Sequence, residues 1–263
     1  MQNVRPPAVA GRFYPVEASV LACDVRAMLA AAKPCAYSPK ALIAPHAGYV
    51  YSGPIAASAY IALQNIAARI RRVVLLGPTH RVAVRGMALP GADAFATPLG
   101  IVQLDLAAAQ AIVHLPQVTA SLPAHAQEHS LEVQLPFLQA VLPDFKLLPL
   151  AVGMATPEEV AEVLEILWGG DETLIVVSSD LSHYLPYDTA RQVDTASTQS
   201  ILALEHTLSH EQACGATPIN GLMLAARRHH LTPHLLDLRN SGDTSGPRDG
   251  VVGYAAFAFT QAD

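Results

Sequence analysis

Histidine and aspartate side chains directly follow three apolar runs of this sequence. His46 ends the run "LIAPH", His80 ends "VLLGPTH", and Asp180 and His183 lie in "IVVSSDLSHY". Strand ends usually carry Gly, Asn or Ser for turn chemistry, so imidazoles and a carboxylate at three such positions are unusual. Neutral imidazole binds transition metals and also moves protons near neutral pH. A single histidine is more often structural, but together these residues favour a metal site or an acid–base site.

The apolar runs themselves are typical of buried β-strands. Four of them end in Gly, Pro, Ser or a polar residue, and they cover 40–46, 72–80, 145–153 and 173–180. Helical patterns lie between and after them, in 54–64, 130–142, 156–167 and about 189–208. A further strand at 251–260 is expected to pair with 233–238. This alternation favours a layered α/β/α fold with a central mixed, mostly parallel sheet, in a single domain of residues 1–263.

The order of these elements brings the polar residues together. In an open α/β sheet, the loops after the carboxyl ends of parallel strands line the ligand crevice. The 34 residues that separate His46 from His80 make about one strand–helix–strand unit. We therefore expect both imidazoles to lie at one rim of the sheet, with Asp180 and His183 beside them.

Composition excludes several classes of protein. Hydrophobic residues make up 51% of the 263 residues and charged residues 14%, which is typical of a packed globular protein. The formal charge is -6 and the longest basic cluster is the short "RIRR", so nucleic acid is not an expected partner. The N-terminus does not resemble a secretory signal, and no apolar run reaches the ~18 residues that span a bilayer. We expect a cytoplasmic protein without membrane association.

The three cysteines, Cys23, Cys35 and Cys214, are too few and too scattered for a disulfide framework or a four-cysteine zinc site. Cys23 lies in an apolar helical pattern and Cys35 in a loop, which favours structural roles. Cys214 precedes the helical pattern "ATPINGLML". A helix N-terminus lowers the pKa of a thiol, so Cys214 is a candidate metal ligand or nucleophile.

The segment "QEHSLEVQLP" allows two interpretations. Ser130 and Glu132 can cap a helix that begins here. Alternatively, Glu128 and His129 contribute to the site, and we expect His129 to line it. The remaining histidines have no companion motif and are assigned no role: His114, His125, His206, His210, His229, His230 and His234.

Eight motifs in order along residues 8 to 260 resemble the Memo family. They are "AGRFYP", "IAPHAGYVYSG", "LLGPTH", "TPLG", "EHSLEVQLPFL", "VVSSDLSHY", "CGATPI" and "SGDTSG" with "VVGYAAFAF". Bacterial and archaeal members are described as the B component of an AmmeMemoRadiSam system. The resemblance therefore implies a radical-SAM-like protein and a second small protein as candidate partners.

The family's fold is similar to that of class III non-haem-iron extradiol dioxygenases, which open catechol-type rings with molecular oxygen. Those enzymes hold Fe(II) with two histidines and a carboxylate. Memo proteins look like relatives in which a cysteine replaces the carboxylate. The resemblance implies His46, His80 and Cys214 as metal ligands and His183 as the acid–base residue. Asp180 is expected to orient His183 or His80.

Iron(II) is the metal that this resemblance favours. A thiolate ligand shifts metal preference towards copper or zinc, so both stay open as alternatives. The residues behind His46 are expected to admit and wall a small-molecule substrate: Gly48, Tyr49, Tyr51 and Gly53.

Three functions are compatible with this pattern. The first is a mononuclear non-haem-iron oxygenase that acts on a small aromatic molecule. The second is a non-catalytic metal-binding or adaptor protein with a vestigial dioxygenase site. The third is a zinc-type hydrolase, because His/His/Cys with bound water is also a hydrolytic arrangement. The sequence contains no nucleophile elbow, phosphate-binding loop or dinucleotide fingerprint.

Overall fold

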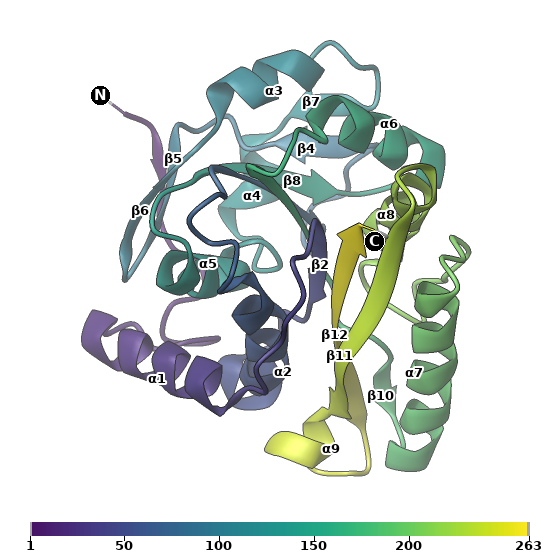
Figure 1. The fold of residues 1–263 in the computed structure, drawn as a ribbon. Helices are drawn as coiled ribbons and strands as arrows, with labels where there is room; N and C mark the ends of the chain where they lie inside the picture. The colour runs from purple at the N-terminus through teal and green to yellow at the C-terminus, as the bar shows by residue number, and fades with distance from the viewer. Residues whose placement is uncertain (1, 262–263) are drawn as a thin grey trace.

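A mixed β-sheet runs through the centre of the molecule (Figure 1). The structure, a computed structural model, describes residues 2–261. The strands of the sheet are β2 (Ala41–Ala44), β3 (Arg72–Pro78), β4 (Met87–Leu89), β7 (Val118–Ala120), β8 (Lys146–Val152), β9 (Thr173–Ser178), β10 (His183–Leu185), β11 (Leu231–Asn240) and β12 (Val251–Gln261). Within the described residues their order is β10-β12-β2-β9-β3-β8-β4-β7, and β11 also pairs with β12. A small second sheet has the order β1 (Val4–Arg5), β5 (Ala94–Thr97) and β6 (Gly100–Gln103).

The centre of the large sheet is parallel. Strands β2, β9, β3 and β8 are parallel neighbours, whereas β12 is antiparallel to β2, and β4 is antiparallel to β8. All residues of β2 and β9 are buried, as are all but the first of β3 and β8. Such continuous burial is what a strand covered on both faces requires, and it explains the unbroken apolar runs. The four predicted central strands and the mixed sheet are confirmed.

The predicted pairing near the C-terminus is confirmed as well. Strand β11 pairs with β12 antiparallel, from Leu231 opposite Gln261 to Asn240 opposite Gly253. The register shifts between Leu235 and Asp237, so the predicted partner segment contains a bulge.

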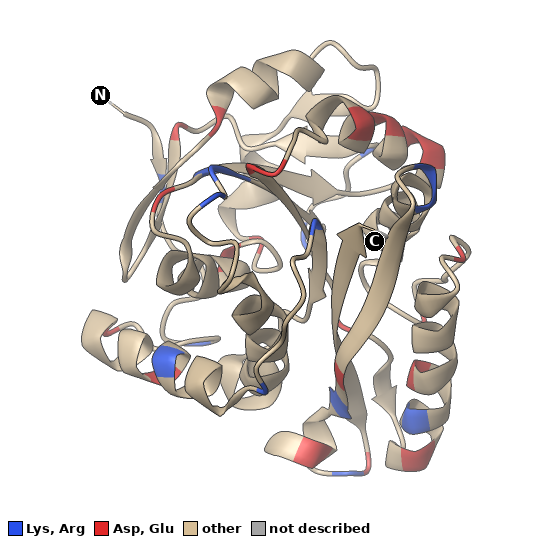
Figure 2. Cartoon of the chain, viewed as in Figure 1, with Lys and Arg blue, Asp and Glu red and all other residues tan. Residues whose placement is uncertain are grey.

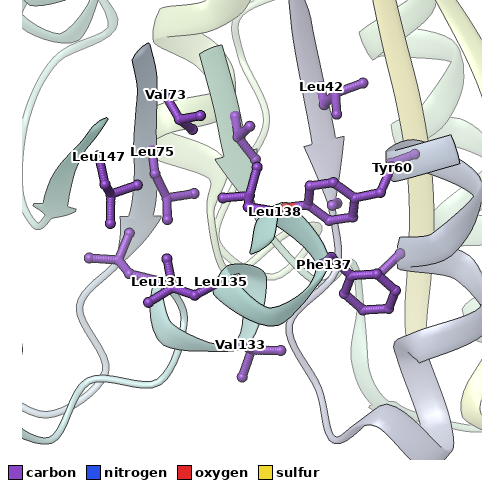
Figure 3. Packing of buried hydrophobic residues seen from close by; sticks show 14 of the residues in the cluster. Leu42, Tyr60, Val73, Leu75, Leu131, Val133, Leu135, Phe137, Leu138 and Leu147 are labelled. Carbon is purple, nitrogen blue, oxygen red and sulfur yellow. The ribbon is translucent and has the colours of Figure 1, made fainter. Parts of the chain in front are cut away.

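Helices cover both faces of the large sheet. They are α1 (Ala18–Ala31), α2 (Tyr49–Tyr60), α3 (Leu106–Ile112), α4 (Leu122–Ala126), α5 (Leu135–Val141), α6 (Pro157–Leu167), α7 (Tyr187–Leu202), α8 (Ala216–Arg228) and α9 (Ser241–Thr244), with 3-10 turns η1 (Ile61–Leu63) and η2 (Glu132–Gln134). Alternate residues of β3 enter opposite cores: Val73 and Leu75 pack on the side of α1, α2 and α5, and Val74 and Leu76 on the side of α6 and α8. Figure 3 shows the first core, where strand residues such as Leu75 face α5. The α/β/α layering predicted from the sequence is confirmed.

Two helices begin at places that differ from the predicted ones. Helix α2 begins at Tyr49 rather than after Gly53, so the segment directly behind His46 is helical. The predicted helix 130–142 is divided into η2 and α5, and Pro136 stands in the first turn of α5. Proline is tolerated in a first helical turn because its missing N–H has no partner there, so the helix begins at this point.

Charged residues lie on several helices, strands and loops (Figure 2). Figure 2 shows acidic residues gathered along α6, while Lys and Arg are scattered among several elements. Throughout residues 2–261, each helix is too short or too polar to cross a lipid bilayer.

Candidate metal centre

Three imidazoles meet at the carboxyl end of the parallel strands. His46 follows β2 and His80 follows β3, and β9 lies between these two strands. The ring centroids of His46 and His80 are 5.3 Å apart, and His129 lies 5.3 Å from the first and 4.6 Å from the second. One ligand atom from each of the three lies within 4.8 Å of the others. Two nitrogens that share a zinc ion at about 2.0–2.1 Å are ~3–3.5 Å apart, so small side-chain movements let this cluster hold one metal ion.

His129 comes from the loop between α4 and η2, not from a strand end. The Phe13 ring packs against it with a centroid distance of 4.7 Å. Burial, followed by the nearby His80, lowers the pKa of His129 to about 4. His129 is therefore neutral at pH 7, which is the form of imidazole that binds metals.

Cys214 also lies beside this cluster. Its Sγ is 3.4 Å from Nε2 of His46, although the thiol is not one of the three mutually close donors. A tetrahedral ion bonded to both atoms holds sulfur and nitrogen about 3.5 Å apart. Burial, followed by the Asp180 carboxylate, raises the pKa of the Cys214 thiol to about 12. This direction is opposite to the one expected from the start of α8, because loss of hydration outweighs the nearby backbone N–H groups.

His46 is almost completely buried and is held at two points. Its backbone N–H donates to Oδ1 of Asp180 at 2.7 Å, and Nδ1 lies 2.8 Å from Oγ of Ser178. Burial, with smaller effects of His129 and the other neighbouring imidazoles, lowers the pKa of His46 well below its ordinary value. The ring is a neutral ligand candidate.

Asp180 was expected to orient the ring of His183 or His80. The described hydrogen bonds of its carboxylate instead run to backbone N–H groups of the segment that carries His46. Burial raises the pKa of Asp180, and these hydrogen bonds oppose that shift. The carboxylate therefore forms its hydrogen bonds with the turn after β2.

Glu128 is the partner of His80. Its Oε1 lies 2.9 Å from Nδ1 of His80, and its Oε2 accepts the backbone N–H of His80 at 2.6 Å. Oε1 also accepts the backbone N–H groups of His129 and Ser130, each at 2.9 Å. Burial alone would raise the pKa of Glu128, but the hydrogen bond and charge of His80 lower it to about 2. One ionised carboxylate thus orders both the His80 ring and the His129 loop.

Ser130 and Glu132 do not form the helix cap that the sequence suggested. The Ser130 hydroxyl donates to the Pro78 carbonyl at 2.8 Å. Glu132 is fully buried and accepts hydrogen bonds from the Arg5 guanidinium and the Tyr14 hydroxyl, each at 2.6 Å. Both side chains instead connect segments that are distant in sequence, and the buried ion pair between Arg5 and Glu132 is not evident from the sequence.

His183 lies at the start of β10, beside the cluster. Its Nδ1 is 2.8 Å from the carbonyl of Leu181, and its charge is one of the smaller causes that lower the pKa of His46. His183 is thus near His46 without belonging to the three close donors.

The expected pocket residues divide between two roles. Tyr49 is buried in the core and its hydroxyl donates to the Val133 carbonyl at 2.8 Å, so it does not wall a pocket. Gly53 faces the Met28 sulfur, where a Cβ would clash, so it allows α1 and α2 to pack closely. Gly48 is the N-cap residue of α2, and Tyr51 keeps 39% of its surface exposed in the first turn. Of these four, Tyr51 is the one whose side chain is accessible.

A cavity is lined by residues other than the clustered imidazoles. It has a volume of about 980 Å³ and is bounded by α1, the following loop, α2 and β11, with Cys35, Tyr37 and Arg239 in its wall. None of the three clustered histidines lines it.

Comparison with known proteins places this chain among Memo-like proteins. A sequence profile described as "Memo-like protein" matches residues 5–258. Proteins described as MEMO1 family proteins are similar over almost their whole length. The relative from Methanosarcina barkeri is 35% identical and aligns over 96% of this chain and 98% of its own. The relative from Archaeoglobus fulgidus is 36% identical, over 97% and 99%. The relative from Aquifex aeolicus is 34% identical, over 98% and 99%.

One solved structure shares the fold. The crystal structure of an uncharacterized protein from Escherichia coli K12 superposes with a TM-score of 0.52 at 13% sequence identity. The match covers 82% of this chain and 98% of that chain. At this identity the similarity concerns the fold alone.

Proposed function

This chain belongs to the Memo family, and from that premise and the imidazole cluster we propose that it is a mononuclear non-haem-iron redox enzyme. Its substrate is a small aromatic molecule, as in the dioxygenases that the family resembles. The observation that carries the proposal is the convergence of donor nitrogens from His46, His80 and His129 at the carboxyl end of the sheet. That end is where open α/β sheets bind ligands.

We assign the metal to His46, His80 and Cys214, with His129 as an adjacent donor. The spacing of 3.4 Å between Cys214 Sγ and His46 Nε2 supports the thiolate as a ligand. The donor set fits iron(II), and also copper or zinc, because imidazole suits all three metals and thiolate favours the softer ones. Zinc does not change oxidation state, so a redox function favours iron or copper, and iron(II) is our first choice because the dioxygenases that the family resembles use it.

When bound, such a metal supplies Lewis acidity and electron transfer to substrate and oxygen. The residues of the chain supply the remaining functions. His183 holds or moves a proton at Nε2, because its Nδ1 faces the Leu181 carbonyl. Asp180 fixes the backbone of His46, and the exposed Tyr51 contacts the substrate. The other components of the AmmeMemoRadiSam system are the proposed protein partners.

A non-catalytic metal-binding or adaptor protein is the second candidate. It is supported by the lining of the cavity of about 980 Å³, which includes none of the three clustered histidines. An enzyme for small molecules usually acts in a well-formed pocket.

Anaerobic reconstitution tests the proposal. The protein is stripped of metal, loaded with Fe(II), and mixed with oxygenated buffer that contains catechol-like or indole-like compounds. Substrate-dependent oxygen consumption that His183→Ala reduces supports the enzyme. Stoichiometric metal binding without oxygen consumption supports the adaptor, and failure to bind Fe(II), copper or zinc contradicts both.

A further inference from the structure

We infer that Ser178, held by Gln134, fixes the proton of His46 on Nδ1 so that the Nε2 lone pair faces the metal position, and that Glu128 does the same for His80. This inference rests on the proposed metal site, and it adds three positioning residues that touch no metal themselves. It follows from counting donors and acceptors along buried hydrogen bonds.

Gln134 lies in η2 and is fully buried. Its Oε1 lies 2.8 Å from the Tyr60 hydroxyl, and its Nε2 lies 2.9 Å from the Pro45 carbonyl. A carbonyl only accepts, so the atom facing Pro45 must be the amide nitrogen. The same nitrogen lies 2.7 Å from Ser178 Oγ and donates its second proton there.

Ser178, the last residue of β9, has one hydroxyl proton to donate. Its Oγ lies 2.6 Å from the Ser130 carbonyl, which only accepts, so the proton points to Ser130. The oxygen lone pairs then face Gln134 and, at 2.8 Å, Nδ1 of His46. An imidazole nitrogen that faces a lone pair must carry the proton. In the neutral ring, Nε2 of His46 is therefore left with the lone pair.

His80 reaches the same tautomer through a different partner. Its Nδ1 lies 2.9 Å from Oε1 of Glu128, which also accepts the backbone N–H groups of His129 and Ser130, while Oε2 accepts the backbone N–H of His80. Both carboxylate oxygens therefore act as acceptors. Nδ1 of His80 therefore donates, and Nε2 keeps the lone pair. A carboxylate partner also raises the basicity of a ligating imidazole. His80 is then the more electron-rich of the two ligands, because the hydrogen-bond partner of His46 is the neutral hydroxyl of Ser178.

The consequence is a site whose ligand atoms are ready before metal arrives. Neither the His46 ring nor the His80 ring has to rotate or move its proton from one nitrogen to the other before it binds the metal. Loss of such outer partners typically lowers metal affinity by about 10–100-fold.

Nitrogen NMR of histidine-labelled, metal-free protein tests the inference directly. The nitrogen shifts and long-range couplings to the ring protons distinguish a protonated Nδ1 from a protonated Nε2. We expect both His46 and His80 to carry the proton on Nδ1. Resonances are assigned with His46→Gln and His80→Gln.

Ser178→Ala removes the acceptor of His46. We expect the His46 resonances to show a mixture of tautomers or the Nε2–H form, and Zn(II) affinity to fall about 10–100-fold. Ser178→Thr keeps the hydroxyl and should restore both. Ser197→Ala is the matched control, because the buried Ser197 hydroxyl donates to the Val193 carbonyl within α7. This control should change neither readout.

Glu128→Gln tests the part of the inference that concerns the tautomer of His80, and Glu165→Gln is its control. Glu165 accepts from Nε2 of His229 at 2.7 Å, so it is a second carboxylate–histidine pair outside the cluster. We expect Glu128→Gln to shift the His80 resonances and weaken Zn(II) binding, and Glu165→Gln to shift those of His229 alone.

A wild-type spectrum with the proton on Nε2 of His46 would overturn the inference, as would a Ser178→Ala protein with unchanged tautomer and affinity. Should Ser178→Ala not fold, the wild-type spectrum and Ser178→Thr still decide. Nδ1–H tautomers in a protein that binds no metal would support the inference and refute the proposed function, so the two failures are distinguishable.

Discussion

The two ends of the parallel strands use their polar side chains in different ways. At the amino end, Lys40 precedes β2 and its ammonium group donates to three backbone carbonyls at 2.6–2.8 Å. Arg72 begins β3, and its Nε lies 2.7 Å from Oδ2 of Asp105. Both cations bond to carbonyl or carboxylate oxygens of the protein, so this end serves the stability of the fold.

At the carboxyl end, only one nitrogen of the His46 ring and one of the His80 ring are hydrogen-bonded to an oxygen atom of the protein. Nδ1 of His46 and of His80 bonds to Ser178 and to Glu128, respectively. The opposite nitrogens have no carbonyl or carboxylate acceptor among the hydrogen bonds of the described residues, and Nε2 of His46 has only the Cys214 thiol nearby. Hydrogen-bonding capacity that the fold does not use is what a ligand requires. The comparison therefore predicts that substitutions at this end affect metal binding and those at the amino end affect stability.

The largest effect is expected from His80→Ala. Because it removes a proposed ligand atom, Zn(II) affinity should fall by more than the ~10–100-fold typical of an outer partner. The free energy of unfolding of the metal-free protein should also fall, because the buried Glu128 carboxylate loses its hydrogen bond to the His80 ring. Competition with a chromophoric chelator measures the affinity. His229→Ala is the control, and an equal loss of affinity there would contradict the distinction.

The second-largest expected effect shows whether Cys214 or His129 is the third metal ligand. The Cys214 thiol is protonated at pH 7, since burial raises its pKa to about 12, and it must lose this proton to bind metal. We expect Zn(II) binding to release one proton per ion, measured by calorimetry in buffers of different ionisation enthalpy. Cys214→Ser should abolish this release and His129→Ala should retain it. Binding without proton release in the wild type, with His129→Ala weakening it more than Cys214→Ser, would make the three histidines the ligand set, because His129 is neutral at pH 7.

A smaller effect is expected at the amino end. Lys40→Met leaves three carbonyls without their donor, and the free energy of unfolding should fall by about 1–3 kcal/mol. Urea denaturation of the metal-free protein measures this change. Zn(II) affinity should remain that of the wild type, and a tenfold loss would show that the two ends are coupled.

The smallest effect concerns a polar group at the carboxyl end that the fold does use. Thr156 and Glu159 form a capping box at the start of α6, which follows β8. Thr156→Ala should lower the free energy of unfolding by about 1 kcal/mol. A thermal unfolding scan detects this, and metal affinity should not change. A loss of metal binding would place α6 in the site.

The layered fold can be predicted from the sequence because a strand that is buried on both faces is apolar at nearly every position. The runs around Val74 and Val176 are apolar throughout, and such continuity has few other causes. Helix boundaries are less accessible. The division of the predicted helix 130–142 depends on Pro136 and on the contacts of Glu132 with Arg5, which lies 127 residues away.

The candidate site, too, contains residues that can be predicted from the sequence and residues that cannot. His46 and His80 can be predicted because parallel strands bring their carboxyl ends together whatever their separation in sequence. Gln134 and Ser178 could not be assigned, and Glu128, a candidate in the sequence, could not be matched to His80, since each acts through a contact more than 40 residues away in the chain. Hydrogen bonds of this kind depend on tertiary packing and leave no periodic pattern.

Anomalous X-ray diffraction from crystals of the metal-loaded protein tests the central claim most directly. We predict one metal peak per chain, at about 2.0–2.1 Å from Nε2 of His46 and Nε2 of His80, with the Cys214 sulfur at about 2.3 Å. A peak bonded through Nδ1 of either ring, a peak elsewhere in the molecule, or no peak after loading with iron, copper or zinc would contradict the account.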